Sequence, residues 1–355
     1  MRIGIYDPYL DDIGGGEKYM MTIAQILSKE NKVDVFWNND RDFEVISKRF
    51  GIDFTKIKRV DNIFVPSVGL VQRLLATKPY DVLILLSDGS IPLVASRKLL
   101  LHIQQPLFNS QATSLWGKIK LSRVNKIFCN AFFTKNFVDK ALGRDTEVIY
   151  PPVAIKAQHL TKQNIILHVG RFRVKNVAIG DYKKQSIMVD TFKKMIDNEL
   201  KDWKFVLAVS IQEKDKESFE KMKESAKGYP IEFFVNKTND ELWELYSKAK
   251  IYWHASGYGE NLNVHPEYAE HFGISTVEAM GAGCVPVVIN AGGQKEIVTD
   301  KKNGFLWSSL EELQKLTESL IKSPNTLKSI SEKSKERAKD FGPDVFEEKI
   351  MQLIK

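Results

Sequence analysis

The chain has 355 residues, of which 43% are hydrophobic and 27% are charged, a composition that excludes wholesale disorder. This length indicates two domains of about 150 to 200 residues each rather than one hydrophobic core. The net charge of +7 is compatible with anionic partners without choosing among them. No apolar run reaches the roughly 18 residues that a membrane span needs, and the N-terminus lacks a signal peptide's apolar region, so we expect a cytoplasmic protein.

The N-terminal half alternates short apolar runs with helical patterns. The first run, RIGIY, leads through a glycine-containing loop to residues 18–29, whose apolar side chains recur at helical spacing. Strands buried on both faces are predicted at 2–6, 32–37, 80–86, 98–103, 126–130 and 147–150. Strands separated by helices imply right-handed parallel crossovers.

A second alternating series follows a Pro-Pro step and a polar stretch. Its strands are predicted at 164–169, 203–209, 231–235, 251–254, 285–289 and 304–307, and Lys/Glu-rich helices at 310–322, 325–340 and 344–354. The expected fold is α/β, with two Rossmann-like, doubly wound parallel-sheet domains facing each other across a cleft. The expected boundaries are 1–152 for the N-terminal acceptor-side domain, 153–163 for a linker, 164–340 for the donor domain and 341–355 for a C-terminal helix. In one of the expected arrangements, that helix packs back against the N-terminal domain.

Three glycines, Gly14, Gly15 and Gly16, lie where the first strand turns into a helix. Without Cβ atoms, their backbone can approach a phosphate or a sugar closely at the helix N-terminus, which makes Gly15 and Gly16 candidate ligand contacts. The spacing is not G-x-G-x-x-G, because Tyr19 occupies the last position, so a nicotinamide site is disfavoured. The alternative is a flexible turn with a helix cap.

The stretch EHFGISTVEAM carries two glutamates, Glu270 and Glu278, around a small uncharged turn. Ser275 and Glu278 match a capping box, which accounts for one carboxylate but not for the other. If a helix begins at Ser275, the free amides of Ile274, Ser275 and Thr276 suit a diphosphate. Carboxylates do not bind phosphate, so we expect them to bind the hydroxyl groups on either side of it. The sequence thus predicts a nucleotide-sugar site.

Five fragments in order resemble the retaining family 4 glycosyltransferases with the GT-B fold, the glycosyltransferases group 1. The most specific fragment is EHFGISTVEAMGAGCVPVVINAGGQKEIV, with its E-x7-E pattern. The others are GGGEKY (14–19), YPPV (150–153), HVGRF (168–172) with KKQ (183–185), and ELYSKAKIYWHAS (244–256). The resemblance covers nearly the whole chain and implies transfer of a hexose from a nucleoside diphosphate-sugar.

The resemblance also implies roles. Glu278 is expected to hold the ribose and Glu270 the transferred sugar, with backbone contacts from Phe272, Gly273, Ile274, Ser275 and Thr276. Arg171 and Lys183 are expected to clamp the diphosphate, although the insertion VKNVAIGDYK (174–183) leaves Lys184 as an alternative. The plain alternatives are a surface ion pair for Arg171 and a solvated helix start for Lys183.

Two further positions follow from the same resemblance. The nucleobase is expected to stack near Val235 and Asn236. His102, at the end of a strand, matches the family's active-site histidine, whereas a lone histidine is more often a structural residue. His254 and His271 are interpreted as scaffolding around the site.

The implied reaction proceeds through an oxocarbenium-like state while negative charge grows on the leaving phosphate. Arg171, Lys183 and the helix amides are placed to stabilise that charge. We expect retention of configuration, no cofactor and no metal site. Asp40-Arg41-Asp42 spells an Asp-x-Asp pattern, but it is far in sequence from the donor motifs and is interpreted as a solvated turn.

Little in the sequence identifies the acceptor, which we expect to be a glycan or a lipid-linked molecule; nucleic acid is not an expected partner. Residues 114–128 mix apolar and basic side chains, as a helix lying weakly on an anionic membrane does, for instance at the inner face of the cell membrane. A core-packed helix with a wet basic face is the alternative. The donor is expected to be GDP-mannose or a UDP-hexose. The competing functions are an inactive nucleotide-sugar-binding subunit and a GT-B-fold epimerase.

Overall fold

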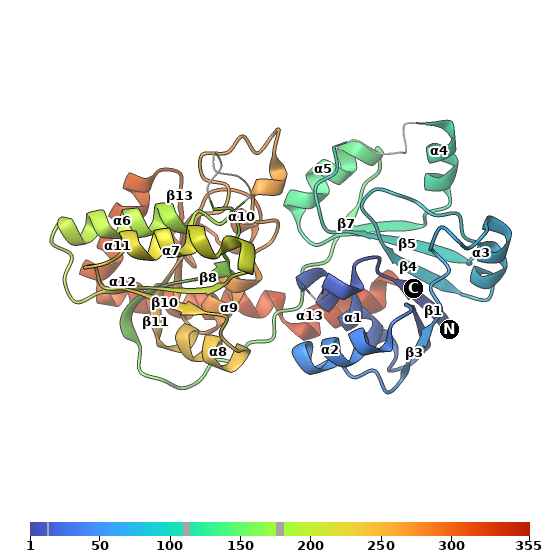
Figure 1. The fold of residues 1–355 in the computed structure, drawn as a ribbon, viewed down its shortest axis with the longest axis horizontal. Coiled ribbons are helices and arrows are strands. Elements are labelled where there is room, and N and C mark those ends of the chain that lie inside the picture. The colour runs from blue at the N-terminus through green and yellow to red at the C-terminus, as the bar shows by residue number, and fades with distance from the viewer. Residues whose placement is uncertain (13, 109–113, 175–180) are drawn as a thin grey trace. The chain divides into compact units, whose positions relative to one another are not determined.

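The computed structural model describes residues 1–12, 14–108, 114–174 and 181–355. The chain divides into two compact units (Figure 1). One unit combines Met1–Pro152 with Pro343–Lys355, and the other is Val153–Gly342. The last helix, α13 (Pro343–Leu353), belongs to the first unit, because Phe346 and Ile350 are buried in the core that Tyr19 and other residues of the first helix form.

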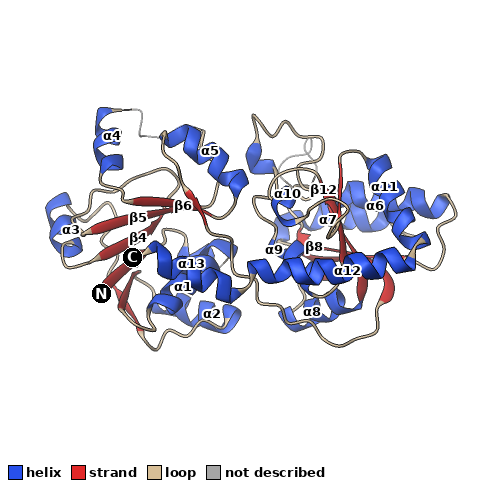
Figure 2. Ribbon diagram, turned by 180° about the vertical axis from the view of Figure 1, so that it is seen from behind, coloured by secondary structure: helices blue, strands red, loops and turns tan. Residues whose placement is uncertain are grey.

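The first unit is built on a parallel sheet of seven strands in the order β3-β2-β1-β4-β5-β6-β7. The strands are β1 (Arg2–Tyr6), β2 (Lys32–Phe36), β3 (Ile57–Val60), β4 (Val82–Leu86), β5 (Lys98–Ile103), β6 (Lys126–Cys129) and β7 (Glu147–Val148). The helices between them are α1 (Gly15–Leu27), α2 (Asp40–Phe50), α3 (Leu70–Thr77), α4 (Leu115–Ser122) and α5 (Phe132–Leu142). Figure 2 shows α1, α2 and α13 on one side of the strands and α4 and α5 on the other. The strand order reverses between β1 and β4, so the carboxyl ends of these two strands form a topological switch point.

The second unit is built on a parallel sheet of six strands in the order β10-β9-β8-β11-β12-β13. The strands are β8 (Gln163–Arg171), β9 (Lys204–Ser210), β10 (Ile231–Val235), β11 (Ala249–His254), β12 (Val285–Ile289) and β13 (Phe305–Trp307). The helices are α6 (Gln185–Asp197), α7 (Lys216–Ser225), α8 (Asn239–Lys248), α9 (Ile274–Gly281), α10 (Gln294–Ile297), α11 (Leu310–Lys322) and α12 (Pro324–Ala338). Short 3-10 helices span Leu10–Asp12, Glu213–Asp215, Pro266–Tyr268 and Lys339–Phe341. The expectation of two doubly wound parallel sheets is therefore confirmed.

One sequence-based expectation in the first unit was wrong, and another was only partly met. Asp40 and Asp42 do not lie in a solvated turn but in the first turn of α2, where acidic side chains favour the positive helix end. Asp40 pairs with Arg59, and Asp42 accepts a hydrogen bond from Trp37 at 2.7 Å. Helix α4 meets the alternative of a core-packed helix only in part. It buries Gly117 and Leu121, whereas Leu115 and Trp116 are 75% and 69% exposed.

Within the described ranges, no helix is both long enough and apolar enough to cross a membrane.

Candidate functional site

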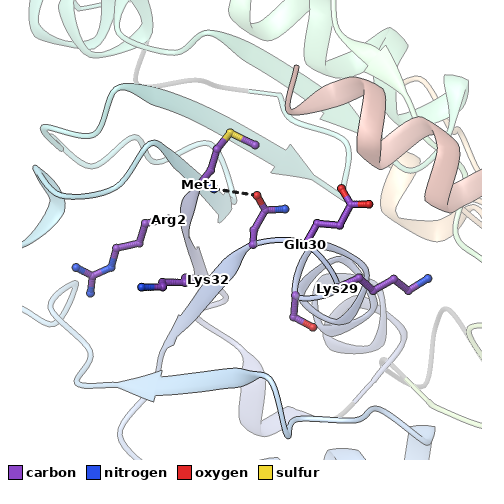
Figure 3. Close-up of a pocket in the computed structure, with 7 residues that line it drawn as sticks. Met1, Arg2, Lys29, Glu30 and Lys32 are labelled. Carbon is purple, nitrogen blue, oxygen red and sulfur yellow. Dashed lines mark hydrogen bonds between the residues drawn. The ribbon is translucent and has the colours of Figure 1, made fainter.

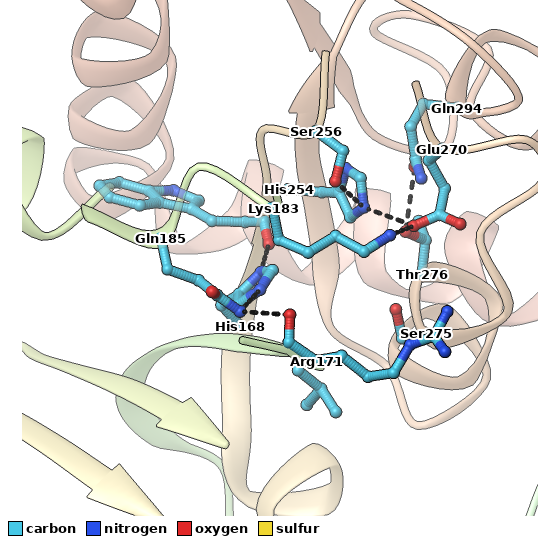
Figure 4. A network of polar contacts seen from close by, with 12 residues as sticks. His168, Arg171, Lys183, Gln185, His254, Ser256, Glu270, Ser275, Thr276 and Gln294 are labelled. Carbon is cyan, nitrogen blue, oxygen red and sulfur yellow. Dashed lines mark hydrogen bonds and ion pairs between the residues drawn. The ribbon is translucent and has the colours of Figure 1, made fainter. Parts of the chain in front are cut away.

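In the second unit, polar side chains gather at the carboxyl ends of two neighbouring strands. Arg171 is the last residue of β8 and His254 the last residue of β11. Lys183 lies just before α6, and Glu270 lies in the turn before α9. Figure 4 shows the side chains of Lys183, His254 and Glu270 converging on one point. Parallel strands place their carboxyl ends at one edge of a sheet, which is where such folds bind ligands.

Glu270 is the centre of this cluster. Lys183 donates a hydrogen bond to Glu270 Oε2 at 2.6 Å, and His254 Nε2 lies 3.0 Å from the same oxygen. Burial of Glu270 opposes its ionisation, but the charge of Lys183 and the contact with His254 outweigh it and hold the pKa of Glu270 well below its usual range. Glu270 is therefore a carboxylate with a fixed orientation. His254, which the sequence suggested only as scaffolding, contacts it directly.

The neighbouring lysine, Lys184, has a different partner. Its ammonium lies 2.5 Å from Glu260 Oε1, and its backbone is in the left-handed region at φ 59° where it precedes α6. The structure thus brings Lys183, and not Lys184, to Glu270. The insertion that left this choice open lies partly outside the described residues, which omit 175–180.

Helix α9 begins one residue earlier than expected, at Ile274, and Gly273 precedes it with φ 121° and without a side-chain cap. This change alters one expected contact. The Thr276 amide is not free, because it donates to the Gly273 carbonyl oxygen at 3.0 Å, and its hydroxyl donates to Gln294 at 2.9 Å. The amides of Ile274 and Ser275 remain as the helix-end donors that a phosphate oxygen would accept from.

The turn before α9 rests on two glycines whose importance the sequence did not reveal. A Cβ atom on Gly292 would overlap the carbonyl oxygen of Glu270, and one on Gly293 would overlap that of His271. The Gly293 amide also donates to the Glu270 carbonyl oxygen at 2.8 Å. This close backbone approach positions Glu270.

Glu278 lies inside α9 and does not cap it, so the capping-box interpretation was wrong. Its carboxylate accepts a hydrogen bond from the hydroxyl of Tyr246 at 2.9 Å. A second tyrosine, Tyr252, donates to the Ser275 hydroxyl oxygen at 2.8 Å. Both tyrosines are buried, and each holds one residue of α9 through its hydroxyl group.

Arg171 is exposed at the end of β8, and within the described part of the chain its guanidinium has no ion-pair partner. Figure 4 shows its side chain extending toward Ser275. A guanidinium group that extends toward a helix N-terminus without a side-chain cap is better suited to binding an anion than to forming a structural ion pair. Phe272, which precedes Gly273, is buried and stacks edge-on against Phe341 at 5.4 Å between ring centroids.

Val235 ends β10, and Asn236 follows it with φ 51°. The side chain of Asn236 already has a structural partner, because its oxygen accepts a hydrogen bond from the Ile211 amide at 3.0 Å. These two residues thus shape the end of an edge strand, and any contact with a base remains an expectation.

The other predicted site residues belong to the first unit. His102 has no exposed surface, and its ring is stacked between Tyr19 and Phe128 at 4.2 and 4.5 Å between centroids. Burial lowers the pKa of His102 to about 3, so the ring is neutral. This environment is that of a packed core histidine, and a catalytic role for it stays a prediction.

Gly15 and Gly16 lie in the first turn of α1, as expected for a glycine loop. The preceding amide, that of Gly14, already donates to the carboxylate of Glu17 at 2.5 Å. Asp7, Asp11 and Asp12 add further acidic groups near this loop. The electrostatic surroundings therefore favour hydroxyl groups over phosphate at this position.

A hollow of the first unit lies at the amino ends of β1 and β2 (Figure 3). It is lined by the first residues of β1 and β2 and by the turn between α1 and β2, and the N-terminal amine donates to Asn31 there at 3.2 Å. The amino ends of parallel strands are not where doubly wound folds bind ligands, so this hollow is not a candidate site.

Comparison with known proteins agrees with this architecture. Residues 154–337 match the family model of glycosyl transferases group 1. The chain is 25% identical over 247 residues to GDP-Man:Man(3)GlcNAc(2)-PP-Dol alpha-1,2-mannosyltransferase of Dictyostelium discoideum, covering 64% of this chain and 46% of that enzyme. It is also 24% identical to an uncharacterized glycosyltransferase of Haemophilus influenzae, covering 96% of both chains. The chain spans less than half the length of the mannosyltransferases that it matches.

Among solved structures, the Anabaena protein Alr3699/HepE in complex with UDP has a TM-score of 0.74 at 17% identity, with 99% of each chain covered. A glycosyltransferase from Rickettsia africae has the same TM-score at 14% identity. These likenesses show a shared GT-B fold, and the match over residues 154–337 shows the family. The chain belongs to the glycosyl transferases group 1.

Proposed function

We propose that this protein is a retaining hexosyltransferase that moves a hexose from a nucleoside diphosphate-sugar to a glycan or lipid-linked acceptor. The observation that carries the proposal is the Lys183–Glu270–His254 cluster beside the uncapped start of α9, toward which Arg171 extends. This arrangement combines an oriented carboxylate for sugar hydroxyls with two cations and helix amides for a diphosphate. A nucleotide-sugar has both kinds of group.

In this proposal the acidic side chains bind the hydroxyl groups of the donor, and the basic side chains bind its diphosphate. Glu270 accepts hydrogen bonds from the transferred sugar, and Glu278 accepts them from the ribose. Arg171 and Lys183 neutralise the charge that grows on the leaving diphosphate, and the amides of Ile274 and Ser275 add fixed dipoles. Because that charge is larger in the transition state than in the bound donor, these groups accelerate the chemical step.

The proposed transfer breaks the bond between the anomeric carbon and the diphosphate oxygen. The acceptor hydroxyl forms the new bond on the same face of the sugar, and its proton passes to the leaving phosphate oxygen. Retention follows from attack on that face. The cations of Arg171 and Lys183 can fill the electrostatic role that a divalent ion has in other transferases, and we propose a metal-independent reaction.

The similar proteins support GDP-mannose and a UDP-hexose as the two proposed donors. The named mannosyltransferase relatives use GDP-mannose, while Alr3699/HepE has been crystallised with UDP and UDP-glucose. The same relatives act on a lipid-linked glycan, which favours an acceptor of that class.

A membrane-facing surface is part of this proposal. Leu115, Trp116 and Ile119 are exposed on α4, and Lys118 and Arg123 are exposed beside them. Aromatic and aliphatic side chains flanked by basic ones bind an anionic bilayer by burial and charge together. We propose weak association with the inner face of the cell membrane through α4.

A donor panel tests the proposed function. UDP- and GDP-linked glucose, mannose and N-acetylglucosamine are each added to the protein, with and without EDTA, and thermal stabilisation and release of nucleoside diphosphate are measured. We expect stabilisation by donors of one base, slow hydrolysis of one donor, and no loss of either with EDTA. Binding without any turnover, even with lipid-linked acceptors, would instead support an inactive binding subunit, and conversion of the free nucleotide-sugar to its epimer would support an epimerase.

A further inference from the structure

The first unit contains a cavity of about 300 Å³ at the carboxyl ends of β1 and β4. Tyr6 ends β1 and Leu86 ends β4, and both line the cavity together with residues that follow each strand. These are the two strands between which the sheet order reverses. Ligands of doubly wound sheets bind in the crevice at such a switch point, and a cavity of this size is at the small end of known ligand sites.

Aromatic rings form one wall of this switch-point cavity. Tyr6 is stacked on Phe64 with 4.3 Å between ring centroids and 23° between ring planes. Arg73 covers the Phe64 ring, with its guanidinium carbon 5.9 Å from the centroid. Tyr9, also in the lining, is 41% exposed. A rigid aromatic wall with one exposed ring suits the apolar face of a sugar ring, whose C–H groups pack on aromatic surfaces.

A carboxylate lies at the same cavity. Asp88 accepts hydrogen bonds from the Tyr9 hydroxyl at 3.2 Å and from the Ser90 amide at 3.1 Å. Partial burial opposes its ionisation, but the hydrogen bonds from Ser90 and Tyr9 outweigh it and lower the pKa of Asp88. A carboxylate has about four acceptor positions, so two protein donors leave room for ligand hydroxyl groups.

An ammonium group completes the lining. Lys120, on α4, lines the cavity, and in the described portion of the chain it forms no ion pair. Asp88, the acidic residue of the lining, accepts hydrogen bonds from Tyr9 and Ser90 instead of pairing with Lys120. A lysine that forms no ion pair within the described ranges, next to a sugar-sized cavity, suits a ligand that carries a negative charge.

We propose that the switch-point cavity binds the acceptor as a sugar ring with an attached phosphate group. The ring packs on Tyr9 and gives its hydroxyls to Asp88, and the phosphate pairs with Lys120. This inference rests on the proposed function, which it deepens by naming the class of acceptor. Both a free sugar phosphate and a lipid-linked sugar diphosphate present this chemistry. The position of Lys120 on α4, the helix proposed to contact the membrane, is compatible with the lipid-linked form.

Ligand-observed NMR titrations test the cavity directly, with N-acetylglucosamine 1-phosphate, N-acetylglucosamine and inorganic phosphate as probes. We expect the sugar phosphate to bind more tightly than either fragment. Lys120→Gln should weaken its binding about threefold to tenfold and bring it close to that of the neutral sugar. Lys118→Gln is the matched control, because Lys118 is exposed on the same helix and does not line the cavity.

Two conservative variants examine the sugar side of the cavity. Asp88→Asn and Tyr9→Phe should weaken binding of the neutral sugar and of its phosphate by similar factors, since the first removes an acceptor for the sugar hydroxyls and the second removes the hydroxyl that holds the Asp88 carboxylate. Equal effects of Lys120→Gln and Lys118→Gln, or no saturable binding of any probe, would overturn the proposal. Binding is also compared between a phytanyl diphosphate-linked N-acetylglucosamine in micelles and the free sugar phosphate. This comparison shows whether the cavity prefers the lipid-linked form or the free form.

The donor reaction gives an independent readout. Binding of UDP or GDP and donor hydrolysis are measured on the same variants, and both should stay unchanged, because Arg171, Lys183, Glu270 and Glu278, which are proposed to bind the donor, lie in the other unit. A loss of nucleotide binding in the cavity variants would show that the cavity takes the donor and would overturn the proposal. If wild-type protein binds the sugar phosphate but no nucleotide-sugar, the cavity stands while the proposed function fails.

Discussion

Lys183 and Glu270 are separated by 87 residues in sequence, yet the ammonium of Lys183 lies 2.6 Å from Glu270 Oε2. Their side chains are only 13% and 23% exposed, so the pair is less screened than a surface ion pair. The pair orders two groups that the proposed function assigns to neighbouring parts of one donor: Lys183 to the diphosphate and Glu270 to the transferred sugar. A diphosphate that binds Lys183 must offset the loss of its ion pair with Glu270. His254 then remains in contact with the Glu270 carboxylate.

The two adjacent lysines should differ sharply in their effects. We expect Lys183→Ala to lower donor turnover by about 100-fold to 1,000-fold, as the loss of one preorganised contact to a developing charge does. Lys184→Ala should mainly lower the melting temperature, because it leaves the carboxylate of Glu260 without the ammonium that now contacts it. Donor hydrolysis rates and thermal melts of both variants measure this difference. A larger loss of turnover in Lys184→Ala than in Lys183→Ala would contradict the assignment.

Substitutions of the two glutamates, Glu270 and Glu278, should also differ in their effects. Glu270→Gln is expected to abolish transfer while sparing nucleoside diphosphate binding, whereas Glu278→Gln should weaken both. Tyr246→Phe is the matched variant for Glu278, because it removes the hydroxyl that donates to this carboxylate at 2.9 Å and leaves the ring in place. It should reproduce part of the Glu278 effect. Calorimetric binding of UDP and GDP and steady-state transfer rates report on the two functions, and equal losses in both glutamate variants would refute the division of roles.

Much of the fold could be predicted because parallel strands are buried on both faces and therefore form continuous apolar runs. β4, for example, is the run VLILL, and all five residues are buried. β3 was missed because it is an edge strand with the polar sequence IKRV, of which only Ile57 is buried. The DRD segment was misassigned because acidic residues are common both in turns and in first helical turns, and Asn39, which caps α2, did not decide between them.

The site was less accessible from sequence, since it depends on contacts between distant segments. The E-x7-E pattern indicated which carboxylates matter, but not that Glu278 accepts from Tyr246 or that His254 contacts Glu270. The capping-box pattern around Ser275 was misleading because the N-cap residue of α9 is Gly273 and not Ser275. The Gly292–Gly293 pair could have been found as a signal of close backbone approach, since two consecutive glycines follow a buried strand.

The pH dependence of stability should have two opposing contributions in the first unit. Burial lowers the pKa of His102 to about 3, so below about pH 6.5 the unfolded chain binds a proton that the folded chain does not, and acidification destabilises the fold. Burial raises the pKa of Asp7 to about 7, so above about pH 3.9 the folded chain keeps a proton that the unfolded chain releases, and acidification stabilises the fold.

Two variants separate these contributions between pH 4.5 and 6.5. Relative to wild type, His102→Phe should lose stability less steeply on acidification, and Asp7→Asn more steeply, each by about 1.4 kcal/mol per pH unit at most. Urea unfolding followed by tryptophan fluorescence at several pH values measures these slopes. Parallel curves for all three proteins would show that neither group titrates as described.

Membrane binding should depend on the exposed apolar side chains of α4. We expect the double variant Trp116→Ser and Ile119→Ser to lose most binding to vesicles containing anionic lipid, because each buried aliphatic or aromatic side chain contributes about 1.5–3 kcal/mol. Co-sedimentation at low salt measures the bound fraction, and the binding should fall at high salt. Val71→Ser on α3, which is 71% exposed, is the control for loss of an exposed apolar residue elsewhere. No binding of the wild-type protein to anionic vesicles would remove the membrane proposal.

Gly293 contacts no substrate in the proposed site, but it supports the turn that carries Glu270. A Cβ atom on Gly293 would overlap the carbonyl oxygens of His271 and Phe272, which are backbone atoms and cannot move aside as a flexible side chain can. We therefore expect Gly293→Ala to displace the turn that carries Glu270 and to disturb its contact with Lys183. A displacement of about 1 Å costs on the order of 100-fold in rate. Gly69→Ala is the matched control, because its φ of −64° suits alanine and no atom lies within 4 Å of the added Cβ. Donor hydrolysis and donor-induced thermal stabilisation should fall together in Gly293→Ala and stay at wild-type values in Gly69→Ala. Wild-type turnover in Gly293→Ala would mean that the position of this turn does not control the chemistry.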